Sequence, residues 1–244
     1  GTNSKECATR LLAAGDLTAQ FENGNLRAIK FGGVEVLRAI SYLVRDKDWG
    51  TYDPVLSDLN IDERDSGFTI SYSALCAGPR PARLGFKAII TGTPNRVMYD
   101  VTATPESDFS TNRCGFCILH PVIGLAGSDV KVEHVDGAVV ESRLPDLIDP
   151  WQPFKNMRAI THQVSDGVFA ECRMDGDTFE MEDQRNWSDA SYKTYVRPLE
   201  LPWPYTLRAG VPIRQTITLS IKGNVASAPS ARQVWLDGIV LSCG

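Results

Sequence analysis

Residues 180–195, EMEDQRNWSDASYKTY, bring together side chains that could do chemistry on a hydroxylated substrate. Phe179 and Met181 alternate with Glu180 and Glu182, so a strand here would turn the apolar pair into a core and both carboxylates out of the opposite face. Two carboxylates at this spacing lie about 6.5–7 Å apart along the backbone. Such a pair suits one protonated acid and one ionised base, although two surface acids balanced by a nearby cation would give the same pattern.

The residues after the acid pair could hold a sugar ring. Arg185 offers a bidentate cation, Asn186 an amide with donor and acceptor, and Trp187 a flat apolar platform. Lys193 and Tyr195 continue the same segment. We therefore expect these five residues to bind substrate.

His120 is a third candidate for chemistry. It ends the apolar stretch GFCIL and precedes Pro121, which stops strand pairing. Because the imidazole pKa lies near neutrality, His120 could act as a general acid or base; a histidine that caps a turn is the alternative.

A second polar and aromatic cluster covers residues 45–54, RDKDWGTYDP. Its charges could pair locally in a solvated loop, or the segment could rim the same cleft as residues 180–195. The sequence leaves both interpretations open.

Composition excludes some partners. The formal net charge of the 244 residues is −5, which argues against nucleic acid and anionic membranes as partners. No apolar run approaches the roughly 18–20 residues that span a bilayer, and the first residues contain no apolar signal core. These features predict a soluble, cytoplasmic protein.

The six cysteines do not form a recognisable metal or redox motif. Cys114 and Cys117 make a lone CxxC, and residues three apart on a strand point to opposite faces. No second CxxC or histidine pair completes a zinc site. We expect free buried thiols, no metal and no cofactor.

Short alternating segments separated by turn residues predict an all-β fold. Asn23-Gly24, Gly32-Gly33 and several Asp-Gly pairs mark hairpins, and only the residues around 6–12 offer a helical turn. We expect a large antiparallel β-sandwich over residues 1–222. Residues 223–230, GNVASAPS, would form a connector, and VWLDGIVL after it would close the sandwich as a terminal strand or lead into a downstream domain.

Several segments together resemble one known family. GNLRAIKFGGVEVLRAISYLVRDKDWGT, GFCILHP, QPFKNMRAITHQV and GDTFEMEDQRNWSDASYKTYVRPLELPWPY are similar to the N-terminal region of D-apionate lactonases, and the resemblance runs from about residue 16 to 219. It implies a β-sandwich domain followed by a barrel-like domain, hydrolysis of a branched-chain aldonolactone, and a place in the cytoplasm of a sugar-degrading bacterium. Trp151 stands where similar sequences are expected to carry a histidine, and no catalytic assignment is carried over.

Lactone opening needs a base that activates water, a stabilised oxyanion and an acid for the leaving alkoxide. The hypothesis assigns Glu182 as the base tuned by Glu180, and His120 as the acid. Arg185 and Asn186 would hold the oxyanion, with Trp187 under the ring.

Two other functions fit the same residues. The chain could be a non-catalytic carbohydrate-binding or structural domain, or a sugar epimerase with a galactose-mutarotase-like supersandwich, which is an analogy of fold alone. In each case we expect a small sugar or sugar lactone as ligand, together with a downstream barrel domain or a second copy as partner.

Overall fold

The computed structural model describes residues 9–78, 83–185 and 190–223. All the regular secondary structure in these ranges consists of β-strands. The strands are β1 (Arg10–Ala14), β2 (Leu17–Glu22), β3 (Asn25–Phe31), β4 (Val34–Val44), β5 (Val55–Arg64), β6 (Gly67–Ala77), β7 (Arg83–Thr93), β8 (Arg96–Pro105), β9 (Phe109–Thr111), β10 (Cys114–His120), β11 (Asp129–His134), β12 (Val139–Arg143), β13 (Phe154–Ser165), β14 (Val168–Asp175), β15 (Phe179–Asp183), β16 (Tyr192–Val196), β17 (Tyr205–Leu207) and β18 (Ile213–Lys222).

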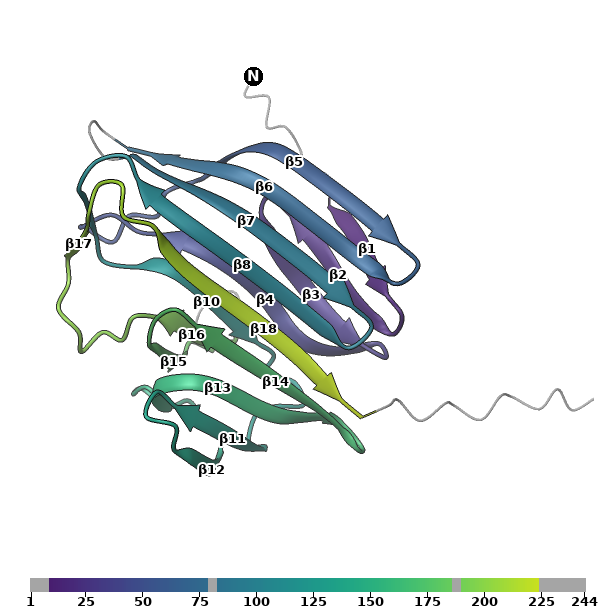
Figure 1. Cartoon of the computed structure of the whole chain (residues 1–244). Helices are drawn as coiled ribbons and strands as arrows, with labels where there is room; N and C mark the ends of the chain where they lie inside the picture. Colours follow the sequence, from purple (N-terminus) through teal and green to yellow (C-terminus); the bar gives the residue numbers. More distant parts are fainter. Residues whose placement is uncertain (1–8, 79–82, 186–189, 224–244) are drawn as a thin grey trace, which may run out of the picture.

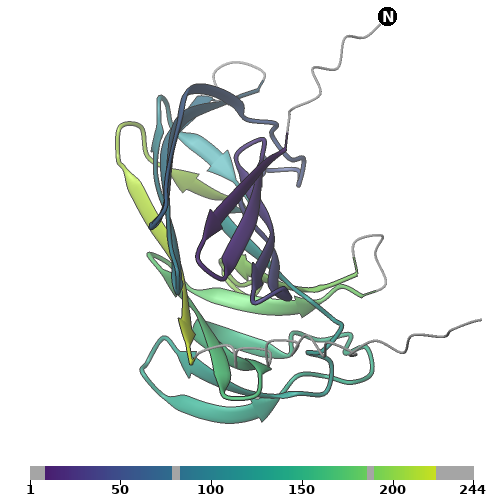
Figure 2. The same ribbon diagram turned by 90° about the vertical axis from the view of Figure 1, so that its right-hand side faces the viewer.

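One antiparallel sheet contains nearly all of these strands. Its order is β1-β2-β3-β4-β10-β16-β15-β13-β14-β18-β8-β7-β6-β5, with β11 and β12 attached through β13, while β9 and β17 pair separately. The sheet folds over so that β1 contacts β6 and β7, and β10 contacts β18 (Figure 1). Figure 2 shows the two layers from the side. The predicted all-β antiparallel sandwich is confirmed.

The turn residues explain the tight hairpins. Asn23 and Gly24 have φ values of 46° and 80°, as a type I′ turn between β2 and β3 requires. Gly32 and Gly33 join β3 to β4 in the same way, with φ values of 55° and 83°. The expected helical turn near residues 6–12 is wrong in its described part, because the chain from Arg10 pairs with β2 as a strand.

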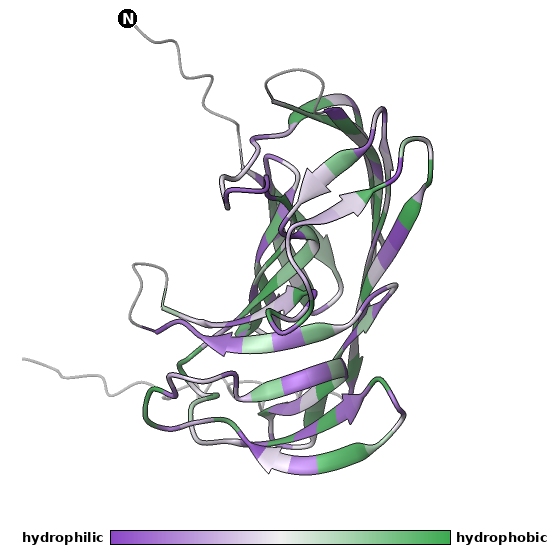
Figure 3. Cartoon of the chain, turned by 90° about the vertical axis from the view of Figure 1, so that its left-hand side faces the viewer, coloured by the Kyte–Doolittle hydropathy of each residue, from purple (hydrophilic) through white to green (hydrophobic). Residues whose placement is uncertain are grey.

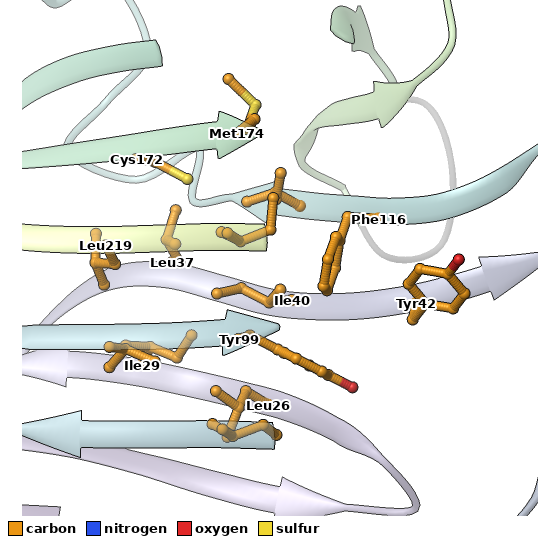
Figure 4. Close-up of a cluster of buried hydrophobic side chains, with 14 of the residues drawn as sticks. Leu26, Ile29, Leu37, Ile40, Tyr42, Tyr99, Phe116, Cys172, Met174 and Leu219 are labelled. Atoms are coloured by element: carbon orange, nitrogen blue, oxygen red, sulfur yellow. The ribbon is translucent and has the colours of Figure 1, made fainter. Parts of the chain in front are cut away.

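Period-two patterns place the core between the layers. Along β8, Val97, Tyr99, Val101 and Ala103 are fully buried, as their alternation predicts. Hydrophobic and hydrophilic residues alternate along many strands in Figure 3, and Figure 4 shows side chains from both layers meeting in the core.

The described cysteines behave as expected. Cys76, Cys114, Cys117 and Cys172 are free and buried. Cys114 lies opposite Val44 and Cys117 opposite Ser41, so the two thiols of the CxxC face opposite ways. Within the described ranges, no group of His, Cys, Asp and Glu could hold a metal ion, and no helix could span a membrane.

The last described strand, β18, ends at Lys222. The expected terminal segment, from residue 224 to 244, lies outside the described residues.

Candidate functional site

The register of β15, β16 and β10 brings the predicted polar residues onto one face. Glu180 lies opposite Tyr195, and Glu182 lies opposite Lys193 on the neighbouring strand. Phe179 and Met181 are fully buried in the core on the other face. The predicted separation of acids and apolar residues is therefore confirmed, and the acids lie on the outer face of the sandwich layer.

Arg113, the residue just before β10, ties the two acids together. Its Nη2 donates to Glu180 Oε1 at 3.0 Å and to Glu182 Oε1 at 2.9 Å, and its guanidinium carbon lies 4.3 Å from the centre of the Tyr195 ring. The Arg113 side chain is only 5% exposed and that of Glu180 only 1%. We call Arg113, Glu180, Glu182, Lys193 and Tyr195 the Arg113 cluster.

Burial of these charges on an outer sheet face needs compensation. A buried ion is costly unless its partners replace the water that it loses. Glu180 Oε1 also accepts the backbone N–H of Leu199 at 2.8 Å, which adds a second donor. Loop residues thus cover the Arg113 cluster and hold Glu180 in place.

The two carboxylates have different surroundings. Burial raises the pKa of Glu180, against the lowering effects of the Leu199 N–H and Arg113. The Glu182 side chain is 19% exposed, and its Oε2 accepts a hydrogen bond from Gln184 at 2.7 Å. Glu182 is therefore the carboxylate of this pair that a ligand or water can reach.

Segment 45–54, whose role the sequence left open, packs against this cluster. The Trp49 ring lies 5.8 Å from the Arg113 guanidinium carbon and 5.2 Å from the Trp203 ring, edge on. Arg45 donates its backbone N–H to Arg113 O at 2.8 Å and its Nη1 to Trp49 O at 3.1 Å. Trp203 is half exposed, so the two rings form an aromatic rim beside the buried charges.

The structure does not bring His120 to the acids. His120 lies opposite Tyr192, on the core face of β10, and its Nε2 is 2.9 Å from Thr194 Oγ1. Burial, with a smaller effect from His162, lowers the His120 pKa to about 3. The expected pairing of His120 with Glu182 in one site is therefore wrong, because strand parity separates them.

Arg185 is also engaged elsewhere. Its Nε and Nη2 bind Asp183 at 2.9 and 2.6 Å, and its Nη1 donates to Asp146 O at 2.6 Å. Asp183 lies on the face opposite Glu182, by strand parity. The structure therefore does not place Arg185 beside Glu182, while Asn186 and Trp187 lie outside the described residues.

Sequence reasoning missed three residues of this site: Arg113, Trp49 and Trp203. Arg113 carries one available signal, since a charged residue directly before the fully apolar start of a strand is costly to bury without a partner. The contact between Trp49 and Trp203 joins segments far apart in the sequence and leaves no local pattern.

A surface hollow of about 840 Å³ lies elsewhere, along β11–β14. The charges on it, such as Lys131 with Glu141, form exposed pairs. In the Arg113 cluster, by contrast, the charges are buried at a cost, and burial raises the pKa of Glu180 beside Arg113, so this cluster is the candidate site.

Comparisons with solved structures agree on the fold. The chain is similar to an aldose 1-epimerase-like protein of Escherichia coli K12, described as putative, with a TM-score of 0.56, 10% identity, and coverage of 89% of this chain and 99% of that one. A galactose mutarotase-like protein of Clostridium acetobutylicum gives a TM-score of 0.56, 10% identity, and coverage of 91% and 100%. A galactose mutarotase-like protein of Lactobacillus casei gives a TM-score of 0.57 and 14% identity, with coverage of 88% of this chain and 100% of that one. These identities show a galactose-mutarotase-like fold and nothing further.

Comparison of the sequence with known proteins identifies the family as well as the fold. The chain is 56% identical over 232 residues to the D-apionate lactonase of Brucella anthropi. The matched region covers 95% of this chain and 38% of that protein. The chain therefore spans well under half the length of this curated relative. A model of the D-apionate lactonase N-terminal domain matches residues 1–224. By this match and that identity, the chain belongs to the family of D-apionate lactonase N-terminal domains.

Proposed function

We propose that the chain is part of a sugar-lactone hydrolase that opens an aldonolactone, of the D-apionate type, to its acid. The observation that carries this proposal is the 56% identity to a D-apionate lactonase over 95% of the chain. In the reaction, water adds to the lactone carbonyl, the ring C–O bond breaks, and the products are a hydroxyl group, a carboxylate and a proton.

Glu182 is the proposed base. It is the more accessible acid of the Arg113 cluster, and Arg113 holds one of its oxygens at 2.9 Å. A carboxylate fixed in this way can take a proton from water and return it to the leaving alkoxide. Glu180 acts as a positioning residue, since it shares the same guanidinium nitrogen.

Positive charge and aromatic rings complete the proposed site. Lys193 lies directly opposite Glu182 on β16, where its charge favours the oxyanion that forms during water addition. Tyr195 packs against Arg113, and Trp203 with Trp49 offers apolar surface for a sugar ring. Binding roles for Asn186 and Trp187 remain predictions.

The test is acid release from an aldonolactone, followed with a pH indicator. Glu182→Gln should lower the rate about 10²–10⁴-fold, because general-base catalysis contributes that much. Glu141→Gln, on an exposed strand, is the matched control and should keep full activity. An unchanged rate in Glu182→Gln would remove Glu182 from the mechanism.

Substrate binding is tested separately with a second matched pair. Trp203→Ala should raise KM, whereas replacement of Trp151, whose side chain is 77% exposed, by alanine should not. Ring binding without acid release would instead favour a non-catalytic carbohydrate-binding domain. A cytoplasmic location, a downstream barrel domain and a homo-oligomer remain predictions of the sequence.

A further inference from the structure

A groove runs along the outer face of β11, β13, β14 and β18. Two hollows of about 840 and 250 Å³ share four lining residues, so they form one continuous depression. Pairing in the sheet puts Lys131 opposite Thr161, and Phe169 opposite Lys222. We call these four residues, with Val139 at the edge, the Phe169 groove.

The groove exposes two large apolar side chains to the surface. Phe169 is 45% exposed and Val139 62% exposed. Two acids beside them are already paired, Glu141 with Lys131 at 3.2 Å and Glu133 with Arg173. An apolar occupant therefore suits this surface better than an ion, because burial of the exposed rings and methyl groups is the gain still available.

The chain leaves the sheet at the rim of this groove. Lys222, the last residue of β18, lines both hollows, and β18 ends beside the start of β14 (Figure 1). Gly223 passes so close to the β13–β14 turn that a Cβ would lie 2.0 Å from Gly167 O. The described chain therefore ends at the rim of the groove, where Lys222 lines both of its hollows and Gly223 lines a neighbouring hollow of about 690 Å³.

The C-terminal residues have a composition that suits this groove. Residues 223–230 are small or polar, and residues 234–241, VWLDGIVL, carry six apolar side chains. Val234 lies 12 positions after Lys222, and a coil of this length spans on the order of 20 Å. A tether of this length gives an effective concentration in the millimolar range.

We propose that residues 234–241 dock in the Phe169 groove of the same chain, with their apolar side chains against Phe169 and Val139. The contact covers the exposed Phe169 and Val139 side chains with apolar groups, and the short connector favours it over contact with another molecule. This inference does not depend on the lactonase activity.

A double-mutant cycle in the full chain tests the contact. Phe169→Thr and the tail pair Trp235→Ser with Leu236→Ser should each lower Tm by a few degrees, about 2–4 °C. Because both remove one contact, Phe169→Thr should lower Tm little further in the tail variant. If Phe169→Thr lowers Tm equally in the chain with the original tail and in the tail variant, the proposal is overturned.

The matched control is Ile89→Thr, on β7, where the side chain is 48% exposed. Its effect on Tm should be the same with either tail. Sedimentation at high and low protein concentration distinguishes the two possible occupants of the groove, the tail of the same chain and a second copy. Coupling that disappears on dilution, together with a fall from dimer to monomer mass, would show a second copy in the groove and would also overturn the proposal.

Discussion

At the scale of single residues, Arg113 organises the candidate site. One of its nitrogens serves both Glu180 and Glu182, and its plane packs on Tyr195. An arginine is suited to this role because its planar, always charged group can bind carboxylates and stack on a ring at once. The site therefore depends on a residue with both electrostatic and packing functions.

Replacement of Arg113 by methionine should destabilise the fold by about 3–5 kcal/mol, because Glu180 would remain buried without its cation. Urea unfolding followed by fluorescence measures this loss. Arg83→Met is the control, since Arg83 pairs with Glu106 on the exposed surface, and it should unfold like the original chain. Equal midpoints for both variants would show that Glu180 needs no partner.

The buried histidines predict a dependence of stability on pH. Burial lowers the pKa of His162 from 6.5 to about 4, and that of His120 to about 3. The unfolded chain thus binds more protons than the folded chain below pH 6.5, so stability is full above 6.5 and is lost as the pH falls toward 4 and 3. For His162 the loss is on the order of 3 kcal/mol.

The His162→Leu variant separates this effect from other titrations. It should flatten the free energy of unfolding between pH 6.5 and 4, because one proton-binding group is gone from the unfolded chain. Ile160→Val, two residues away on the same face of β13, should lower the whole curve and keep its shape. Parallel curves for His162→Leu and the original chain would contradict the prediction.

At the scale of elements, strand parity was predictable and strand pairing was not. The alternation of residues 179–182 correctly gave an apolar face and an acidic face. His120 was misplaced because parity is defined within one strand, and its orientation relative to Glu182 depends on how β10, β16 and β15 align. That alignment is set by contacts distant in sequence, which also bring Arg113 and Trp49 to the site.

Strand β10 is fixed to the opposite layer by Gln215 of β18. Gln215 donates to Cys114 O at 3.1 Å and accepts the Phe116 N–H at 3.2 Å, so its amide replaces a strand partner. Between them, Gly115 has a φ of 147°, and a Cβ there would lie 2.1 Å from Gln215 Oε1. The amide thus occupies the space that any side chain would need.

Gly115→Ala should therefore be destabilising by about 2 kcal/mol or more, since it strains the backbone and displaces the buried amide. Thermal unfolding gives the measurement. Gly85→Ala is the matched control, because its new Cβ would meet only Ala74 O at 3.9 Å, an ordinary contact. A Tm for Gly115→Ala equal to that of the control would mean that Gln215 can move aside without loss.

At the scale of the whole molecule, a single carbonyl joins the two ends of the sheet. Gly24, in the β2–β3 turn, accepts hydrogen bonds from the hydroxyl groups of Tyr72 at 2.8 Å and Tyr99 at 2.5 Å. Tyr72 lies on β6 and Tyr99 on β8, in the layer opposite the turn. The early hairpin is thereby fixed on the later strands by polar contacts within the core.

The two tyrosines should be coupled in stability. Tyr72→Phe or Tyr99→Phe alone leaves one donor for Gly24 O and should cost about 1 kcal/mol, whereas the double variant leaves a buried carbonyl unsatisfied and should cost more than the sum. Denaturant unfolding of the four chains measures the coupling. Tyr42→Phe is the control, because its hydroxyl meets the sulfur of Cys114 and not Gly24, and its cost should add to that of Tyr72→Phe. Additive costs for Tyr72 and Tyr99 would show that water or another donor reaches Gly24, and that the layers are held there by apolar packing alone.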